Sequence, residues 1–277
     1  MKITRSKTVL HVALIVAFVF PALIPGAAKE PKPTVDTIIS KHLDSIGTVE
    51  ARGSVTSRVA EGNVVFAEII QHSLHLEGAA TLMSQERKHR CEFQFGNPHY
   101  PGEQFVYDGN KGMVAMVDQT SRSRLGNFLF LQEEILREGL FGGVLSTAWP
   151  LLKLQDTQPS LKYEGLKKVN GQQLHEITYI PRKRSESGDL SIRLYFEPET
   201  YRHVLTVYTV TTLHGSQTIS DPNQTTAIVE ERFGDFQVVD GLTLPRHWDI
   251  RYRIEPQNLA QEYQWDVSLN QIGHNKL

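Results

Sequence analysis

Two histidine pairs are the residues of this sequence that most resemble metal ligands. His175 and Glu176 begin like the His-Glu-x-x-His helix of zinc proteases, which places a second histidine at the fifth position. Tyr179 stands there instead, and the residues around it alternate like a strand, so two ligands would not share a helical face. His72 and His75 have helical spacing but fall at a turn between predicted strands, and a metal site needs more ligands than these two. The sequence therefore predicts no metal site.

Two pairs of adjacent acids raise the question of acid–base catalysis. Glu133-Glu134 and Glu230-Glu231 are neighbours in sequence, and neighbouring residues of a helix or strand point to different faces. Neither pair then forms a catalytic dyad, and we expect both on a solvated surface. The Gly-x-Ser-x-Gly nucleophile motif and the Gly-x-x-x-x-Gly-Lys phosphate loop do not occur. We predict no catalytic residue and no cofactor. An enzyme whose site these motifs do not reveal remains a third hypothesis, after a carrier and a protein-interaction module.

The single cysteine, Cys91, cannot form a disulfide within the chain. It alternates with Phe93 and Phe95, so the three side chains share one face of a predicted strand. This pattern favours a buried structural thiol over a reactive one.

Charge and length limit the class of protein. The formal net charge of the 277 residues is −2, and residues 1–28 hold three basic and no acidic side chains, so their removal makes the rest more negative. Such a chain does not suit a nucleic-acid partner. What remains is long enough for one β sandwich or barrel with a sizeable core, and we predict a single domain over residues 34–277.

The N-terminus has the composition of a secretory signal peptide. Basic residues in the first seven positions precede an apolar run over 9–23, and residues 25–28 end in the small side chains at which such peptides are cleaved. We expect a signal peptide over 1–28, a spacer over 29–33 and, therefore, a periplasmic mature chain.

A retained membrane anchor is the alternative for this segment. Pro21 and Pro25 interrupt the apolar run, which is shorter than the roughly 20 residues that span a bilayer. No cysteine lies near the cleavage point, so we expect neither a lipid anchor nor another permanent membrane anchor.

The elements of the mature chain are predicted from hydrophobic period. Apolar residues recur at helical spacing over 35–46, with Thr34 as the N-cap and Gly47 as the stop. From Gly53 onward the period changes to two, as in an antiparallel meander. The predicted strands are 55–60, 64–71, 79–84, 90–95, 104–107, 113–117, 161–163, 174–180, 190–196, 204–212, 227–233, 247–254 and 262–269. The turn signals are Asp108-Gly109-Asn110, Asn170-Gly171 and Asp240-Gly241.

A helical segment over 123–152 separates two groups of strands. Ser123 is the predicted N-cap of a helix that ends near Gly139, and apolar residues continue beyond it. Because the apolar content exceeds one helical stripe, the segment is either ordinary core or a plug over a cavity, and periodicity leaves both open. The predicted stripe is Phe128, Leu131, Ile135 and Leu136.

Four segments carry turn and strand signatures in a recognisable order. They are Thr34-Val35-Asp36-Thr37-Ile38-Ile39 leading to His42-Leu43-Asp44-Ser45-Ile46-Gly47; Tyr163-Glu164-Gly165 with Val169-Asn170-Gly171; Leu194-Tyr195-Phe196-Glu197-Pro198-Glu199-Thr200; and Val239-Asp240-Gly241-Leu242-Thr243-Leu244-Pro245. Together they resemble the bacterial outer-membrane lipoprotein carriers, the LolA and LolB family, and particularly its divergent members of unassigned function. The resemblance spans nearly the whole mature chain.

This resemblance implies a fold and a function. The fold is mainly β with a few helices (α+β), an open antiparallel half-barrel sheet covered by the N-terminal helix and a central helical plug. The function is that of an exported periplasmic carrier that binds lipid or lipoprotein acyl chains in an apolar concave cavity, without catalysis. The alternative is a periplasmic protein-interaction module, such as an envelope-stress sensor or assembly factor with an envelope protein partner.

Large apolar residues of the predicted strands and plug are the candidates for lining such a cavity, and each of them is also a candidate for ordinary core. They are Phe93, Phe95, Phe105, Tyr107, Met116, Leu129, Leu136, Trp149, Leu194, Phe196, Trp248 and Trp265.

Overall fold

A computed structural model describes residues 33–70, 74–184, 189–212, 225–255 and 261–277. The predicted signal peptide and nearly all of the spacer lie outside these residues, as does His72. Residues 33–277 form one compact unit. Among the described helices, none has the length and apolar character needed to cross a membrane.

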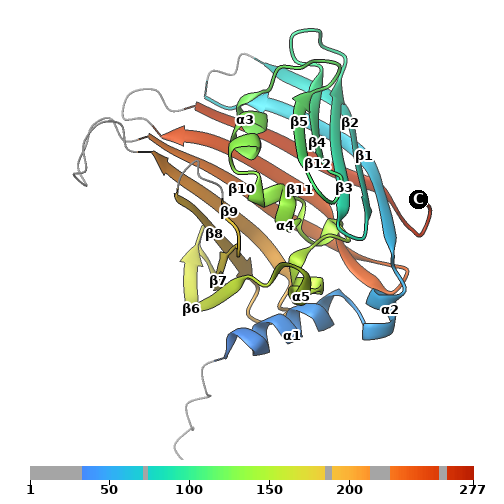
Figure 1. Cartoon of the computed structure of the whole chain (residues 1–277), viewed down its shortest axis with the longest axis vertical. Coiled ribbons are helices and arrows are strands. Elements are labelled where there is room, and N and C mark those ends of the chain that lie inside the picture. Colours follow the sequence, from blue (N-terminus) through green and yellow to red (C-terminus); the bar gives the residue numbers. More distant parts are fainter. Residues whose placement is uncertain (1–32, 71–73, 185–188, 213–224, 256–260) are drawn as a thin grey trace, which may run out of the picture. The chain divides into compact units, whose positions relative to one another are not determined.

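One antiparallel sheet of twelve strands makes up most of this unit (Figure 1). Its spatial order is β5-β4-β3-β2-β1-β12-β11-β10-β9-β8-β7-β6, so β5 and β6 are the two edges and the sheet is open. Strands that are consecutive in sequence pair with one another, except for β5 and β6 at the opposite edges, and β1 pairs with β12 in the middle. The strands are Ser57–Glu68, His75–Gln85, Lys88–Phe95, Gly102–Tyr107, Gly112–Met116, Ser160–Val169, Gln172–Ile180, Asp189–Phe196, His203–Thr212, Thr225–Val239, Leu242–Glu255 and Gln261–His274 for β1 to β12.

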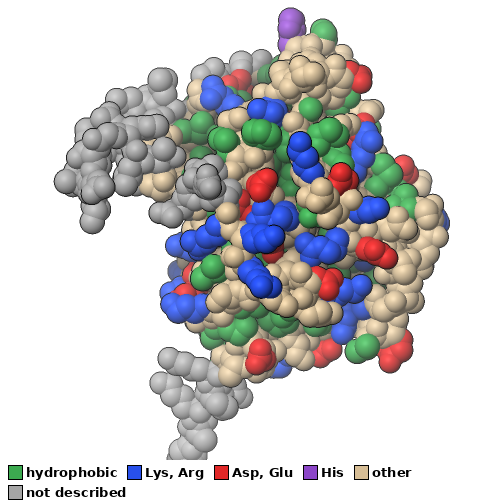
Figure 2. Space-filling model, in the orientation of Figure 1, with side chains coloured by type: hydrophobic (Ala, Val, Ile, Leu, Met, Phe, Trp, Pro, Cys, Tyr) green, Lys and Arg blue, Asp and Glu red, His purple; other side chains and the backbone are tan. Residues whose placement is uncertain are grey.

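Short helices cover one face and one end of the sheet. Helix α1 lies across the end, whereas the segment over 124–157, which we call the plug, runs in front of the central strands (Figure 1). In the same orientation, the surface of the molecule carries basic and acidic side chains with apolar ones between them (Figure 2). The helices are α1 (Val35–Ile46), α2 (Val49–Gly53), α3 (Arg124–Leu131), α4 (Glu134–Glu138), η1 (Gly143–Leu145), η2 (Pro150–Leu152) and α5 (Leu154–Thr157). The predicted class, a mainly β fold with an open antiparallel sheet, a covering N-terminal helix and a central helical segment, is confirmed.

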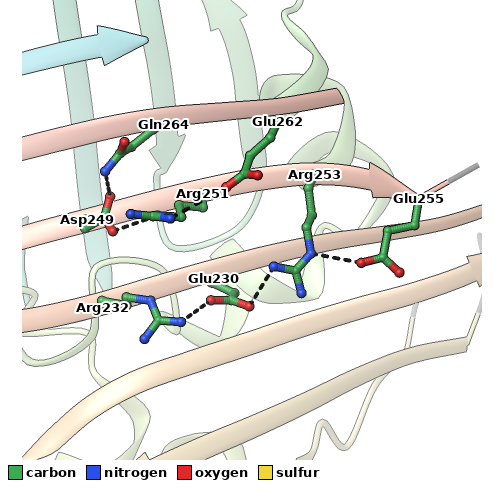
Figure 3. A network of polar contacts seen from close by, with 8 residues as sticks. All are labelled: Glu230, Arg232, Asp249, Arg251, Arg253, Glu255, Glu262 and Gln264. Atoms are coloured by element: carbon green, nitrogen blue, oxygen red, sulfur yellow. Dashed lines mark hydrogen bonds and ion pairs between the residues drawn. The ribbon is translucent and has the colours of Figure 1, made fainter. Parts of the chain in front are cut away.

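The two faces of the sheet differ because side chains alternate along each strand. On β10, Val229, Glu231 and Phe233 point toward the plug and are buried. Their neighbours Glu230 and Arg232 point the other way and belong to a network of ion pairs across β10, β11 and β12 (Figure 3). We call the face under the plug the inner face and the face with this network the outer face.

The first long strand is where the sequence prediction was wrong. The predicted strands 55–60 and 64–71 are a single strand, β1, whose register with β12 shifts between Glu61 and Gly62. A Cβ on Gly62 would lie 2.0 Å from the Ser268 carbonyl oxygen, so glycine allows this close approach. The gap predicted between two strands is therefore a β-bulge within one strand.

The plug also differs from its prediction. The Ser123 N-cap and the Gly139 stop, with φ of 76° at Gly139, are confirmed, but a break after Leu131 divides the expected single helix into α3 and α4. The break turns Leu131 outward, where it is 45% exposed, and Leu129 takes its place in the core.

Candidate functional site

The twelve residues predicted to line a cavity lie together where the inner face and the plug meet. Eleven of them are buried in one apolar cluster and Met116 packs half-buried against it. They come from β3, β4, β5, β8, β11 and β12 and from the plug. The structure therefore brings the predicted set together, and whether these residues bind a ligand stays a prediction.

Aromatic rings join the centre of the plug to the sheet. The Phe141 ring of the plug lies 5.2 Å from that of Phe105 and 5.1 Å from that of Trp248, measured between centroids. Trp248 also contacts Phe93 at 5.9 Å and stacks on Phe233 at 6.4 Å. The plug side chains thus occupy the positions over the aromatic floor that a ligand chain would need.

A second contact joins the plug to α1. Trp149 donates its indole N–H to His42 Nε2 at 3.1 Å and stacks on His203, with 4.7 Å between ring centroids. Burial lowers the pKa of His42 to about 4 and that of His203 well below its ordinary value, so both imidazoles are neutral near pH 7. Three uncharged rings, from α1, the plug and β9, are thus packed together.

Glu231 was expected on a solvated surface, and the structure places it on the buried inner face instead. It is fully buried under the plug, where it accepts hydrogen bonds from the Gly142 N–H at 2.7 Å, the Trp248 indole at 3.0 Å and the Tyr208 hydroxyl at 2.7 Å. Burial raises the pKa of Glu231 to about 7 despite these three donors. Its place between Val229 and Phe233 on one strand was the signal that could have found it.

Glu103 is a second buried acid on the inner face. It alternates with Phe105 and Tyr107 on β4 and accepts the Tyr100 hydroxyl at 2.6 Å. Tyr100 in turn accepts the indole N–H of Trp265 at 2.8 Å. Burial raises the pKa of Glu103 to about 7, so the inner face holds two acids that titrate near neutral pH.

Polar contacts tie the plug to both halves of the sheet. On one side the Thr147 N–H donates to Ser84 Oγ at 2.9 Å. On the other side the Tyr179 hydroxyl donates to Glu138 Oε2 at 2.9 Å, and Glu231 holds Gly142. Since each contact uses one or two atoms, the plug is held at separate points over an apolar surface.

The cavity that Phe105 and Trp248 border under the plug is small. Its volume is about 10 Å³, enough for about one water molecule. A pocket of about 150 Å³ beside Trp149 opens at the plug's surface. A chain-like ligand would therefore reach Phe105 and Trp248 only when the plug moves away.

The residues considered above as metal ligands, catalytic acids or a reactive thiol make ordinary contacts within the fold. Among the described residues, no group of three His, Cys, Asp or Glu side chains is placed to hold a metal. His175 lies in strand β7 and pairs with the Tyr163 hydroxyl at 2.8 Å. Glu230 and Glu231 point to opposite faces, as expected, but the predicted solvated surface is wrong for three of the four acids, because Glu134, Glu230 and Glu231 are buried. Cys91 is a buried free thiol, as predicted.

Replacing Ser123 by alanine should lower the free energy of unfolding by about 1 kcal/mol, since Ser123 Oγ caps α3 by accepting the Gly126 N–H at 2.9 Å. Urea denaturation measures the change. The same substitution at Ser121, which lies outside α3, is the control and should leave the free energy of unfolding within about 0.5 kcal/mol of the parent. Equal losses in the two variants would contradict the cap.

Comparisons with known proteins give structural similarity only. No family model and no curated protein sequence matches the chain. A LolA superfamily protein of Nitrosomonas europaea shares 12% identity over 88% of this chain and 95% of its own, with a TM-score of 0.46. A putative outer membrane lipoprotein-sorting protein domain from Vibrio parahaemolyticus shares 10% identity over 86% and 92%, with a TM-score of 0.44.

A DUF1329 family protein from Desulfovibrio piger shares 10% identity over 88% of this chain and 94% of its own, with a TM-score of 0.45. The family that the sequence segments resemble is thus among the similar structures. With TM-scores below 0.5, these similarities show neither a family nor a function.

Proposed function

We propose that this chain is an exported periplasmic carrier that shelters lipid or lipoprotein acyl chains on the inner face of its sheet, without catalysis. One observation carries the proposal: an open sheet with an aromatic and aliphatic inner face is covered by a segment of short helices attached at separate polar points. A second sheet or long helices would make a permanent cover. A plug of this kind is a cover that can be exchanged.

The energetics of exchange support a reversible carrier. An acyl chain gains about 0.8 kcal/mol for each CH₂ that it buries, before the costs of ordering are subtracted. Opening the plug removes the same kind of contact, because plug residues such as Phe141 and Leu136 are themselves apolar and buried. Gain and loss are of one chemical type, so a partner or small change in conditions decides whether cargo or plug covers the sheet.

The periplasmic compartment is part of the proposal. It is supported by the composition of residues 1–28, which is that of a signal peptide, and it would put an acyl-binding surface where lipids must cross water.

Replacing Tyr179 by phenylalanine should make a fluorescent long-chain fatty-acid probe bind about fivefold more tightly. The change removes the hydrogen bond from Tyr179 to Glu138 of the plug, which is worth about 1 kcal/mol to the closed state, and every 1.4 kcal/mol is tenfold in affinity. Probe fluorescence titration measures the affinity, and mass spectrometry of lipid extracts from natively purified protein identifies the natural cargo.

Tyr163→Phe is the matched control, because that hydroxyl bonds to His175 on the neighbouring strand and not to the plug. It should leave the probe affinity unchanged. Absence of saturable probe binding together with absence of lipid in the purified protein would refute the carrier function.

The two sheet edges support the second candidate, a protein-interaction module. Among the described strands, β5 and β6 each pair with only one other strand, and such a free edge can accept a strand from another protein. Lysines along β6 protect it from unspecific pairing. Purification with one stoichiometric envelope protein and without lipid would favour this function over the carrier.

A further inference from the structure

A separate pocket lies at the end of the sheet where α1 and α2 meet the plug. Its volume is about 320 Å³, at the lower end of the roughly 300–1,000 Å³ typical of small-molecule sites. None of the twelve cavity candidates lines it. Its apolar wall comprises Ile46, Val55, Val144, Leu152 and Leu242.

Arg58 is the most unusual residue of this pocket. It comes from β1 and is only 3% exposed. Its guanidinium donates to the Val144 carbonyl oxygen and, at 3.1 Å, to His274 Nε2. Within the described residues, no carboxylate lies within ion-pair distance of it, so a buried cation has only neutral partners.

His274 does not neutralise that charge. Its Nδ1 lies 2.9 Å from Asp240 Oδ2, so the hydrogen on this nitrogen donates to Asp240 and leaves Nε2 free to accept from Arg58. Burial lowers the pKa of His274, which keeps the ring neutral. The carboxylate of Asp240 is exposed on the far side of the ring, and an imidazole separates it from the guanidinium.

The other charged residues of the pocket are mostly basic. Arg52 donates to the carbonyl oxygens of Leu43 and Gly47 at the end of α1, and its nearest carboxylate, Asp44, is 4.0 Å away and largely exposed. Lys153 also lines the pocket, and Glu86 is the one acid that does so among the described residues. The lining therefore carries an excess of positive charge in a chain whose net charge is −2.

We propose that this pocket binds the anionic end of a single-chain amphiphile. A carboxylate or phosphate there accepts hydrogen bonds from Arg58 and Arg52, which removes the cost of an unpaired buried charge. The first carbons of its chain lie against Ile46, Val144 and Leu242. This site is distinct from the inner face and is present with the plug closed, so it stands or falls independently of the proposed carrier function.

Isothermal titration of the purified full chain with octanoate, octyl phosphate and octan-1-ol tests the site. Octanoate or octyl phosphate should bind with saturation, and octan-1-ol, which lacks the charge, at least tenfold more weakly. The stronger of the two anions identifies the head group. Equal binding of octan-1-ol would overturn the proposal, as would no binding of either anion.

Variants assign the binding to the pocket. Arg58→Gln should weaken the preferred anion at least tenfold and Lys153→Gln about threefold, as expected for a buried and an exposed cation respectively. Arg90→Gln, at an outer-face arginine paired with Glu92, is the matched control and should change nothing. If Arg58→Gln does not fold, as judged by circular dichroism, Arg52→Gln replaces it with the same expected loss. Unchanged binding in a folded Arg58 or Arg52 variant would overturn the site.

A variant of the pocket separates this site from the inner face. Lys153→Gln should weaken octanoate binding about threefold and leave the affinity for the long-chain fatty-acid probe unchanged, because Lys153 lines this pocket and not the inner face. An equal loss of octanoate and probe affinity in this variant would show one shared site and overturn the proposal of a second.

Discussion

Replacing Glu231 by glutamine should stabilise the chain more at pH 8 than at pH 4.5. The difference in free energy of unfolding between variant and parent should be about 3 kcal/mol more favourable to the variant at pH 8. The Glu231 pKa is raised from its ordinary 4.5 to about 7 in the folded chain. Between these two values the folded state binds more protons than the unfolded state. The parent therefore loses stability as pH rises through this window, whereas glutamine does not titrate.

Glutamine can keep the hydrogen bonds of the site. Its oxygen accepts from the Gly142 N–H and the Trp248 indole, which both reach Oε1 today, and its amide N–H₂ donates to the Tyr208 oxygen in place of the present contact with Oε2. The substitution thus removes the buried charge and little else. Cys91 and Tyr208 also face this carboxylate, and burial with the negative charge of Glu231 raises the pKa of both, so neither titrates below pH 8.

Comparison with the parent is necessary because other buried groups act in the opposite direction. His42 and His89 have pKa values lowered to about 4 by burial, so their contribution to stability is lost as pH falls from 6.5 toward 4. These effects are common to both proteins and cancel in the difference. Urea denaturation at pH 4.5, 6 and 8 gives the profile.

Glu255→Gln is the matched control, since Glu255 is exposed and paired with Arg253 on the outer face. It should change the free energy of unfolding by no more than about 1 kcal/mol at each pH. A Glu231→Gln profile parallel to that of the parent would mean that Glu231 is not a buried acid.

Trp248→Ala should lower the free energy of unfolding by about 3–5 kcal/mol. The indole is fully buried between Phe93 on the sheet and Phe141 on the plug, and it donates to Glu231. Alanine leaves a cavity and also removes the indole donor from the buried carboxylate of Glu231. Loss of this hydrogen bond further lowers the free energy of unfolding. Such a change is a large part of the roughly 5–15 kcal/mol that stabilises a typical protein.

Two further substitutions separate cavity from hydrogen bond. Trp248→Phe keeps most of the ring and loses the N–H, so it should cost about 1–3 kcal/mol. Phe130→Ala is the control at a plug aromatic that is 46% exposed, and it should cost less than about 1 kcal/mol. Equal losses for Trp248→Ala and Phe130→Ala in denaturant titrations would contradict the packing described for Trp248.

Much of the fold was predictable from alternation and turn residues. Asn170-Gly171 and Asp240-Gly241 have positive φ at both positions, as the hairpin turns predicted there require. The bulge at Gly62 was not predictable, because a glycine within an alternating run is compatible with a turn and with a bulge until its partner strand is known. That partner, β12, is distant in sequence.

The site was predictable only for its apolar part. Large apolar residues at alternate positions indicate an inner face, and all twelve candidates lie on it or against it. Buried acids such as Glu231 contradict the rule that charges face water, so polarity alone places them outside. The pocket around Arg58 needs residues from both ends of the chain and from the plug, and no local pattern brings these together.

The β1–β12 ladder also sets the order in which this chain can fold. Arg58 on β1 and His274 on β12 are paired across 216 residues, in the middle of the sheet rather than at an edge. During synthesis β1 can pair with β2, but its other edge has no partner until the last strand has been made. Pairing over such a separation is slow, because a long loop must close before its contacts form. Until β12 pairs with it, β1 presents an unpaired edge, and a chaperone that covers this edge would protect the chain from aggregation.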